Sequence, residues 1–308
     1  MAYRILTTSS SFGKVDPKPL EMLKEAGFEV VLNPHGRKLT IEESKELMPG
    51  FDGMIAGTEK LNHEVLSAAP SVKYLCRLGA GMDSVDFDAA DALQVKVENT
   101  PSAHIDGVAE LTLGGILSSL RSIATAHANM TTGLWKKPMG SLLARKIIGI
   151  IGLGQVGKRL VELTAPFKVK VLAYDLSPDK AFAEANNIDL VSLDDMAAQA
   201  DIITLHVPFM KESKGLINAD FLSKAKPNLM MVNASRGGLI DEEALFSFLN
   251  ENQKASAYLD TFESEPYNGP LCSLDNCTLT PHIGSYASEV RVNMETEAAQ
   301  NVINHFSK

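Results

Sequence analysis

The stretch from Lys146 to Asp175, KIIGIIGLGQVGKRLVELTAPFKVKVLAYD, constrains the fold of this chain more than any other. It opens with a short, mostly β-branched apolar run, Ile147–Ile151, which predicts a strand buried in a parallel sheet. Glycines at G-x-G-x-x-G spacing follow at Gly152–Gly157, and apolar residues then recur at helical spacing. A second apolar strand, Val169–Tyr174, leads to Asp175. Strand, glycines, helix, strand and acid in this order predict a dinucleotide-binding unit.

Each part of this unit has a physical task on a dinucleotide. Gly152 permits a tight turn, Gly154 lets the backbone approach a pyrophosphate, and Gly157 lets the helix pack near the sheet. The helix N-terminus offers N–H groups and a partial positive charge to the phosphates. Asp175 would bind the ribose hydroxyls of NAD and repel the 2′-phosphate of NADP. The alternative is a glycine-rich turn in some other α/β domain. The predicted contacts here are Gly152, Gly154, Gln155, Val156, Gly157 and Asp175.

Length and composition are those of a globular protein with two domains. The 308 residues are 45% apolar and 22% charged, and the net charge of −9 gives no basic stripe for a nucleic-acid partner. The three cysteines have neither metal nor redox spacing, which favours free thiols in a reducing compartment. No carboxylate or histidine cluster has ligand spacing, so we expect no metal. Neither a signal-peptide core nor an apolar run of the ~18 residues of a membrane span is present, so we expect a cytoplasmic protein without a membrane partner.

Short strands and helices alternate over residues 1–100, which predicts a second parallel sheet covered on both faces. The expected strands are Arg4–Thr8, Phe28–Leu32, Gly53–Ala56, Lys73–Leu78 and Val95–Val97. A long helix is expected at residues 107–130, packed between domains or across a subunit interface. A last helix, 285–306, is expected to return to the first domain. The predicted fold class is therefore α/β, with two doubly wound parallel-sheet lobes.

Polar residues follow the predicted strands of both lobes, where ligands of open α/β sheets bind. In the first lobe, Gly79 and Gly81 would expose N–H groups to a substrate carboxylate, or else they serve a turn that needs glycine. The candidate substrate contacts there are Arg77, Gly79, Ala80, Gly81 and Asn99. In the second lobe, the strand ends carry an arginine, carboxylates and a histidine, which suit the oxidation of a hydroxyl to a carbonyl. They lie in Asn233–Gly237, Asp260–Pro266 and Pro281–Gly284.

Five segments carry a resemblance to a known family. They are ENTPSAH (98–104), GLGQVG (152–157), NASRGGLIDEEAL (233–245), LDTFESEP (259–266) and TPHIGS (280–285). The chain resembles the D-isomer-specific 2-hydroxyacid dehydrogenases, and within them the phosphoglycerate dehydrogenase group of serine biosynthesis. The resemblance implies a Rossmann NAD-binding domain, 101–283, inserted into a flavodoxin-like substrate domain formed by 1–100 and 284–308.

The resemblance also assigns a catalytic set, Arg236, Glu265 and His282, with NAD as cofactor. His282 would take the proton of the substrate C2 hydroxyl while hydride leaves for nicotinamide C4, a task that suits an imidazole with its usual pKa near ~6.5. Glu265 would orient and stabilise the imidazole, and Arg236 would bind the substrate carboxylate or carbonyl with its planar fork. Asp260 would lie near the nicotinamide carboxamide. The further cofactor contacts implied are Val207, Pro208, Ala234, Ser235, Arg236, Asp260, His282 and Gly284, and Arg236 and His282 also contact the substrate.

The remaining histidines are expected to be structural. They are His35, His63, His104, His127, His206 and His305.

For the substrate, the resemblance points first to 3-phosphoglycerate, with Arg77 and Lys60 as cations for the phosphate. The loop after Ala56 lacks an arginine that several phosphoglycerate dehydrogenases carry, and Glu59 adds an opposing charge. Glyoxylate, hydroxypyruvate or another small 2-oxo acid is therefore the alternative substrate.

A different class of protein also fits the sequence, namely a non-catalytic NAD-responsive binding protein such as the C-terminal-binding-protein corepressors. A formate dehydrogenase fits less well, because the extended N-terminal region of that branch is missing. We expect a homodimer built through the nucleotide domain. Since the chain ends at Lys308 without a regulatory domain, we do not expect serine feedback.

Overall fold

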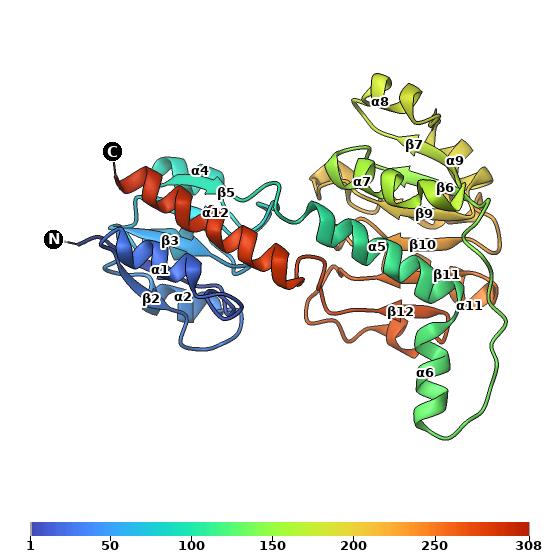
Figure 1. Cartoon of the computed structure of the whole chain (residues 1–308), viewed down its shortest axis with the longest axis horizontal. Coiled ribbons are helices and arrows are strands. Elements are labelled where there is room, and N and C mark those ends of the chain that lie inside the picture. Colours follow the sequence, from blue (N-terminus) through green and yellow to red (C-terminus); the bar gives the residue numbers. More distant parts are fainter. Residues whose placement is uncertain (1, 308) are drawn as a thin grey trace. The chain divides into compact units, whose positions relative to one another are not determined.

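The computed structural model of the chain describes residues 2–307 and shows two compact units (Figure 1). One unit combines Met1–His104 with Ser285–Lys308, and the other is Ile105–Gly284. The second unit therefore interrupts the sequence of the first. The sequence-based boundaries after residues 100 and 283 lie within a few residues of these positions.

The first unit is built on a five-stranded parallel sheet with the order β2-β1-β3-β4-β5. The strand order reverses between β1 and β3, as in flavodoxin-like folds, and ligands of such sheets bind at the carboxyl ends near the reversal. The strands are β1 (Arg4–Thr7), β2 (Glu29–Leu32), β3 (Gly53–Ala56), β4 (Tyr74–Arg77) and β5 (Lys96–Asn99).

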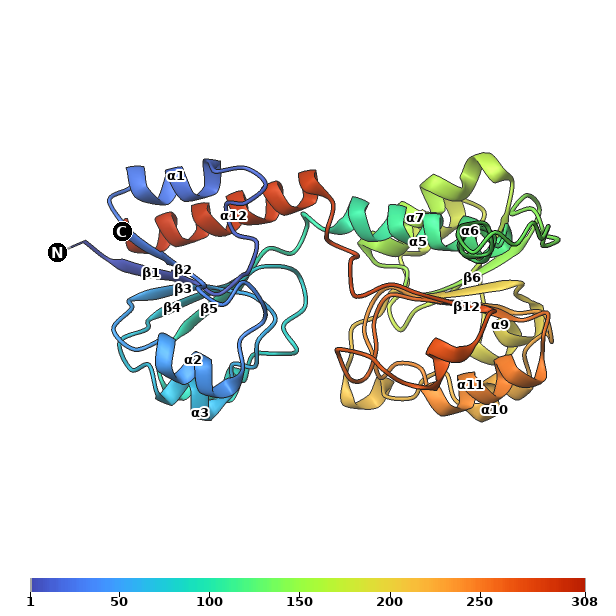
Figure 2. The same cartoon turned by 90° about the horizontal axis from the view of Figure 1, so that it is seen from below.

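Helices cover both faces of this sheet (Figure 2), with α1 and α12 on one face and α2, α3 and α4 on the other. Neighbouring residues of β1 point to opposite faces, so Ile5 packs with Met294 of α12 while Leu6 packs with Leu66 of α3. Burial on both faces explains why these strands read as continuous apolar runs. The helices are α1 (Lys18–Glu25), α2 (Ile41–Leu47), α3 (His63–Ser67), α4 (Phe87–Ala92) and α12 (Ser288–Phe306).

The second unit is built on a seven-stranded parallel sheet with the order β12-β11-β10-β9-β6-β7-β8. This is the Rossmann order, and it reverses between β6 and β9. The strands are β6 (Ile147–Ile151), β7 (Lys170–Tyr174), β8 (Asp189–Leu190), β9 (Ile202–Leu205), β10 (Met230–Asn233), β11 (Ser256–Leu259) and β12 (Cys277–Leu279).

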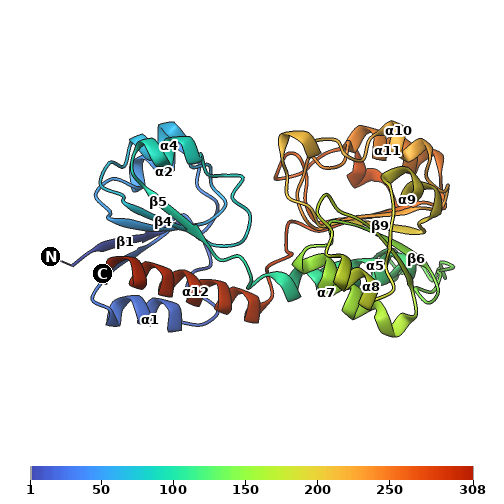
Figure 3. The same ribbon diagram turned by 90° about the horizontal axis from the view of Figure 1, so that it is seen from above.

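Helices cover both faces of the second sheet as well, with α5 and α7 on one face and α9, α10 and α11 on the other (Figure 3). Ile150 packs with Ile116 of α5, and its neighbour Ile151 packs with Leu245 of α11. The predicted fold class is therefore confirmed. The helices are α5 (Ile105–Leu120), α6 (Ile123–Thr131), α7 (Gln155–Thr164), α8 (Lys180–Ala185), α9 (Leu193–Gln199), α10 (Ala219–Ser223) and α11 (Glu242–Glu251), with 3-10 turns at Ala165–Phe167, Lys211–Ser213 and Pro270–Ser273.

The prediction of one long helix over residues 107–130 is wrong. The structure has two helices there, α5 and α6, because Ser122 between them adopts a left-handed conformation with φ 50° and ψ 40°. A left-handed residue cannot continue a right-handed helix. The apolar periodicity on both sides of the break is helical, so periodicity alone did not reveal it.

Candidate active site

The three glycines of the loop after β6 and the first turn of α7 have three different surroundings. Gly152 has φ +99°, and a Cβ there would lie 2.6 Å from the carbonyl oxygen of His206 at the end of β9. A Cβ on Gly157 would lie 2.3 Å from the carbonyl oxygen of Gly152, so this glycine lets α7 start against the sheet. A Cβ on Gly154, the N-cap of α7, would meet nothing within 4 Å. The space beside Gly154 is therefore open at the N-terminus of α7, the kind of position that binds phosphate groups in dinucleotide-binding folds.

Asp175, directly after β7, is tied to this loop. Its Oδ2 accepts a hydrogen bond from the Leu153 N–H at 2.7 Å, and its Oδ1 accepts one from the Ser177 N–H at 2.8 Å. The carboxylate thus has a fixed position next to the glycine loop, and each oxygen keeps lone pairs for the two hydroxyls of a ribose.

The loop after β10 carries Arg236 and is braced by Asn233. The Asn233 Oδ1 accepts hydrogen bonds from the Ser235 N–H and hydroxyl, and its Nδ2 donates to the Arg236 carbonyl at 2.7 Å. Arg236 Nη1 donates to the Ser235 carbonyl at 2.6 Å. Gly237 completes the loop, since a Cβ there would lie only 1.8 Å from the carbonyl oxygen of Phe262. The loops after β10 and β11 are therefore in direct backbone contact.

Asp260, at the end of β11, is fully buried and organises the turn after β12. Its carboxylate accepts hydrogen bonds from the Thr280 hydroxyl at 2.6 Å and from the N–H groups of Ile283 and Gly284 at 2.8 Å each. Burial raises the pKa of this carboxyl, and these three hydrogen bonds oppose the increase. The structure thus shows Asp260 engaged with its own chain, in contacts that the sequence did not suggest.

His282 lies inside the turn that Asp260 holds. It adopts φ 54°, which costs a residue with a Cβ roughly 1–2 kcal/mol, and its N–H donates to the carbonyl of Asp260 at 2.9 Å. The ring Nδ1 lies 2.9 Å from Oε2 and 3.1 Å from Oε1 of Glu265. Both side chains are partly exposed. The Glu265 carboxylate orients the ring through Nδ1, so the second ring nitrogen, Nε2, is not used in this contact.

The remaining cofactor candidates of this unit lie around the same loops. Val207 contacts the site of a Gly152 Cβ through its Cγ1, and Pro208 follows it at the end of β9. Ala234 is buried, and its carbonyl oxygen lies 3.9 Å from the position of a Cβ on Gly284. Because all the strands are parallel, these carboxyl ends share one edge of the sheet.

His206 was expected to be a structural histidine, and its backbone lies against the glycine loop. Its carbonyl covers Gly152, and its ring Nε2 hydrogen-bonds the Thr204 hydroxyl at 3.0 Å. Burial lowers the pKa of His206 to about 4, so the ring is neutral at physiological pH. In the sequence, the position of His206 directly after the apolar run of β9 indicated that it lies at the carboxyl end of a strand.

The candidate substrate residues of the first unit follow β4 and β5. The Gly79 N–H is not free for a substrate, because it donates to the Thr100 hydroxyl at 2.7 Å. The Asn99 side chain braces the same loop by donating to the Ala80 carbonyl at 2.9 Å, and the Arg77 guanidinium folds back to donate to the Leu78 carbonyl. The structure gives no internal hydrogen bond for the N–H of Ala80 or of Gly81 within the residues it describes, so these remain the candidate donors.

A buried carboxylate, Glu59, lies at the reversal of strand order in the first unit. Glu59 is buried after β3, where its Oε1 accepts hydrogen bonds from the Thr8 hydroxyl and, at 3.1 Å, from the Gly57 N–H. Lys60 beside it is exposed.

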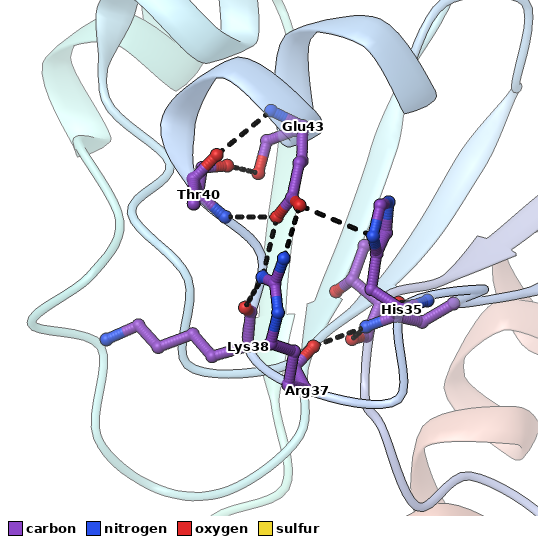
Figure 4. A network of polar contacts seen from close by, with 8 residues as sticks. His35, Arg37, Lys38, Thr40 and Glu43 are labelled. Atoms are coloured by element: carbon purple, nitrogen blue, oxygen red, sulfur yellow. Dashed lines mark hydrogen bonds and ion pairs between the residues drawn. The ribbon is translucent and has the colours of Figure 1, made fainter. Parts of the chain in front are cut away.

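After β2, a polar network pairs Arg37 with Glu43 through two bonds of 2.6 and 2.8 Å (Figure 4). The Arg37 guanidinium and the Thr40 N–H lower the pKa of Glu43 to about 2. Glu43 is therefore ionised, and its charge already neutralises the Arg37 guanidinium.

Within residues 2–307 no group of three histidine, cysteine, aspartate or glutamate side chains has the arrangement of a metal site. A search of the same residues gives no helix with the length and apolar character needed to cross a membrane.

The second unit matches a known protein family over most of its length. Residues 113–284 match the family described as "D-isomer specific 2-hydroxyacid dehydrogenase, NAD binding domain". The chain therefore belongs to the D-isomer-specific 2-hydroxyacid dehydrogenases, as the resemblance implied. The matched region is the NAD-binding domain of that family, which confirms NAD as the expected cofactor.

The relatives of this chain are named for different substrates, among them 3-phosphoglycerate, glyoxylate and hydroxypyruvate. The chain is 38% identical to the D-3-phosphoglycerate dehydrogenase of Mycobacterium leprae over 252 residues, which are 81% of this chain and 48% of that protein. It therefore spans about half the length of the curated mycobacterial relatives that it matches. It is 36% identical to the glyoxylate reductase of Thermofilum pendens over 301 residues, covering 94% of this chain and 89% of the reductase. The crystal structure of the TT0316 protein from Thermus thermophilus matches with a TM-score of 0.90 at 28% identity, covering 99% of this chain and 97% of that one.

Proposed function

We propose that the chain transfers a hydride between NAD(H) and a D-2-hydroxy acid or its 2-oxo acid. The observation that carries the proposal is the His282 imidazole held by Glu265 at the same sheet edge as the glycine loop. An oriented imidazole and an arginine at the ligand-binding edge of a Rossmann sheet suit the interconversion of a hydroxyl and a carbonyl group by hydride and proton transfer.

Bound NAD supplies the nicotinamide carbon that accepts or returns the hydride. In the oxidation, His282 Nε2 takes the proton of the C2 hydroxyl, and the Glu265 carboxylate at Nδ1 stabilises the resulting imidazolium. In the reduction, the imidazolium returns that proton to the new alkoxide. The guanidinium of Arg236 holds the substrate carboxylate, a task for which its planar fork is better suited than the point charge of lysine.

We assign the cofactor contacts, His282 and Arg236 to the second unit. In the first unit, taken by itself, the N–H groups of Ala80 and Gly81, on a loop braced by Asn99, are donors that suit the carboxylate of an acid. The Arg77 guanidinium lies against the same loop and adds positive charge. Supporting this, the loop follows β4 at the carboxyl edge, the edge at which open α/β sheets bind ligands.

For the substrate we propose 3-phosphoglycerate as the first candidate, on the 38% identity to a phosphoglycerate dehydrogenase. Glyoxylate or hydroxypyruvate is the second candidate, and a specific observation favours it. The buried Glu59 uses the donors of Thr8 and Gly57 at the reversal of the first sheet, where a phosphate would need them. A phosphate there would also meet the Glu59 charge.

A substrate panel tests the proposal. NADH oxidation is measured with glyoxylate, hydroxypyruvate, phosphohydroxypyruvate and pyruvate, and NAD reduction with 3-phosphoglycerate. Turnover of one or more acids supports the dehydrogenase, and the ratio of kcat/KM for phosphohydroxypyruvate and hydroxypyruvate decides between the two candidates. Tight NADH binding without turnover of any acid would instead identify a non-catalytic NAD-responsive protein.

We also propose a cytoplasmic homodimer formed through the second unit. Helix α6 and the loop that joins it to β6 extend from the sheet (Figure 1) and carry exposed apolar side chains, with Trp135 75% and Met139 96% exposed. A cavity of about 720 Å³ adjoins them at the amino ends of the strands, the edge opposite the candidate active site. Sedimentation at micromolar concentration, with Trp135→Ser as the variant, tests the dimer.

A further inference from the structure

Glu242 is an acidic side chain beneath the candidate active site that the proposed chemistry does not use. It is the first residue of α11, directly after the N-cap Asp241, and it is half-buried while its neighbour Glu243 is exposed. Together with Asn233, Gly237 and Thr261 it surrounds a small gap under the loops that follow β10 and β11. Glu242 therefore lies under the two loops that carry Arg236 and Glu265.

The Glu242 carboxylate fixes the loop of Glu265 by a direct hydrogen bond. Its Oε1 accepts from the Glu263 N–H at 2.8 Å, two residues before Glu265. The loop then closes on itself, because the Phe262 N–H donates to Glu265 Oε1 at 3.1 Å. The same Oε1 of Glu265 lies 3.1 Å from Nδ1 of His282. A continuous chain of contacts thus runs from Glu242 through the loop to the imidazole.

The charges around Glu242 are mostly of its own sign. Burial first, and then the carboxylates of Glu263 and Glu265, raise the pKa of Glu242. Lys214, from the segment after the 3-10 turn Lys211–Ser213, pairs with Glu263 at 2.7 Å. The phenol of Tyr267 also faces Glu242, and its pKa is raised chiefly by burial. On the side of His282, the facing carboxylates are Glu265 and Asp260.

We propose that Glu242 is a positioning residue for the Glu265–His282 pair. It holds the loop that presents Glu265, and its negative charge favours the protonated imidazole. This inference rests on the proposed function, because it concerns the acid–base group of that reaction. At a pH where Glu242 is ionised, removing its charge disfavours the imidazolium, so the titration of His282 moves to lower pH.

Two substitutions separate the hydrogen bond from the charge. Glu242→Gln keeps an oxygen that can accept from the Glu263 N–H and removes only the charge. Glu242→Ala removes both. Glu243→Gln is the matched control, since it removes the same charge from the same helical turn at an exposed position.

Two measurements are made on each protein. The first is the pH profile of kcat/KM for oxidation of the best acid of the panel. The second is the NMR titration of the His282 ring in NADH-free protein, assigned with His282→Gln. In Glu242→Gln we expect both midpoints to fall by about half a pH unit, with kcat above the midpoint nearly unchanged. In Glu242→Ala we expect kcat to fall roughly 10-fold as well, because the Glu265 loop loses its anchor. Glu243→Gln should match the wild type.

A folded Glu242→Gln protein with the wild-type midpoint in the His282 titration overturns the inference, and so does an equal shift in Glu243→Gln. The failure of the proposed function is a different result. In that case the wild type turns over no acid, while the NMR titration still decides the role of Glu242. If Glu242→Ala does not fold, Glu242→Gln alone carries the test.

Discussion

The Glu265 carboxylate lies 2.9 Å from Nδ1 of His282 and reaches it from a loop 17 residues earlier in the chain. One ring nitrogen is therefore committed to orientation and the other is available for a proton. His282→Gln removes the proton acceptor without touching the glycine loop. We expect kcat to fall by ~10² or more while the Kd of NADH stays within twofold, measured by steady-state kinetics and fluorescence titration. Near-normal turnover in this variant would remove His282 from the mechanism.

Gly154 and Gly157 form a matched pair that separates cofactor binding from folding. A Cβ on Gly154 enters open space, whereas one on Gly157 would collide with the Gly152 carbonyl at 2.3 Å. Gly154→Ala should keep the Tm of the NADH-free protein and weaken NADH binding about tenfold or more, because the methyl group occupies the pyrophosphate position. Gly157→Ala should lower the free energy of unfolding by roughly 1–3 kcal/mol in the absence of NADH. Equal losses of Tm in both variants would contradict this account of the loop.

The preference between NADH and NADPH follows from Asp175. Both of its oxygens are fixed by backbone N–H groups, so the negative charge cannot turn away from a 2′-phosphate. We expect kcat/KM to be higher with NADH than with NADPH. Asp175→Asn should shrink that ratio by about tenfold, since the neutral amide no longer repels the phosphate. A wild-type preference for NADPH would disprove the role of Asp175.

Asp260 connects stability to the geometry of the candidate active site. Asp260→Asn replaces one acceptor oxygen by an amide donor and leaves a buried N–H of Ile283 or Gly284 without an acceptor. Such a loss costs about 1–3 kcal/mol, and it also frees the turn that holds His282 in its left-handed conformation. We therefore expect a lower Tm together with a lower kcat. Thr280→Val loses the hydroxyl contacts to Asp260 and to the Tyr258 hydroxyl but keeps both backbone contacts to Asp260, so it should show a smaller loss of both. Equal or larger losses would argue against the backbone contacts as the anchor.

The sequence predicted the parts of this molecule that depend on neighbours along the chain. Buried strands, the glycine loop and Asp175 lie within one continuous segment, so spacing alone defined them. The partner of Gly79 did not follow from its neighbours, because the Thr100 hydroxyl that takes its N–H lies 21 residues further on, just after β5. The contacts of Asp260 and Glu242 are long-range in the same way. The break at Ser122 escaped because a single left-handed residue leaves the apolar period of both helices intact.

His206 predicts how stability depends on pH. Burial lowers its pKa from 6.5 to about 4, so between these values the unfolded chain binds a proton that the folded protein does not. The contribution of His206 to the free energy of unfolding is therefore fully present above pH 6.5, the pKa of the unfolded chain. It decreases as the pH falls from 6.5 to 4 and is constant below pH 4. Between about pH 7 and pH 4 we expect the free energy of unfolding of His206→Asn to fall by roughly 2 kcal/mol less than that of the wild type. This figure is smaller than the full linkage value, because the residue is partly exposed. Urea unfolding at both pH values measures this, and the carboxylates that titrate in the same range cancel in the comparison. Parallel losses in the two proteins would show that His206 is protonated in the folded state.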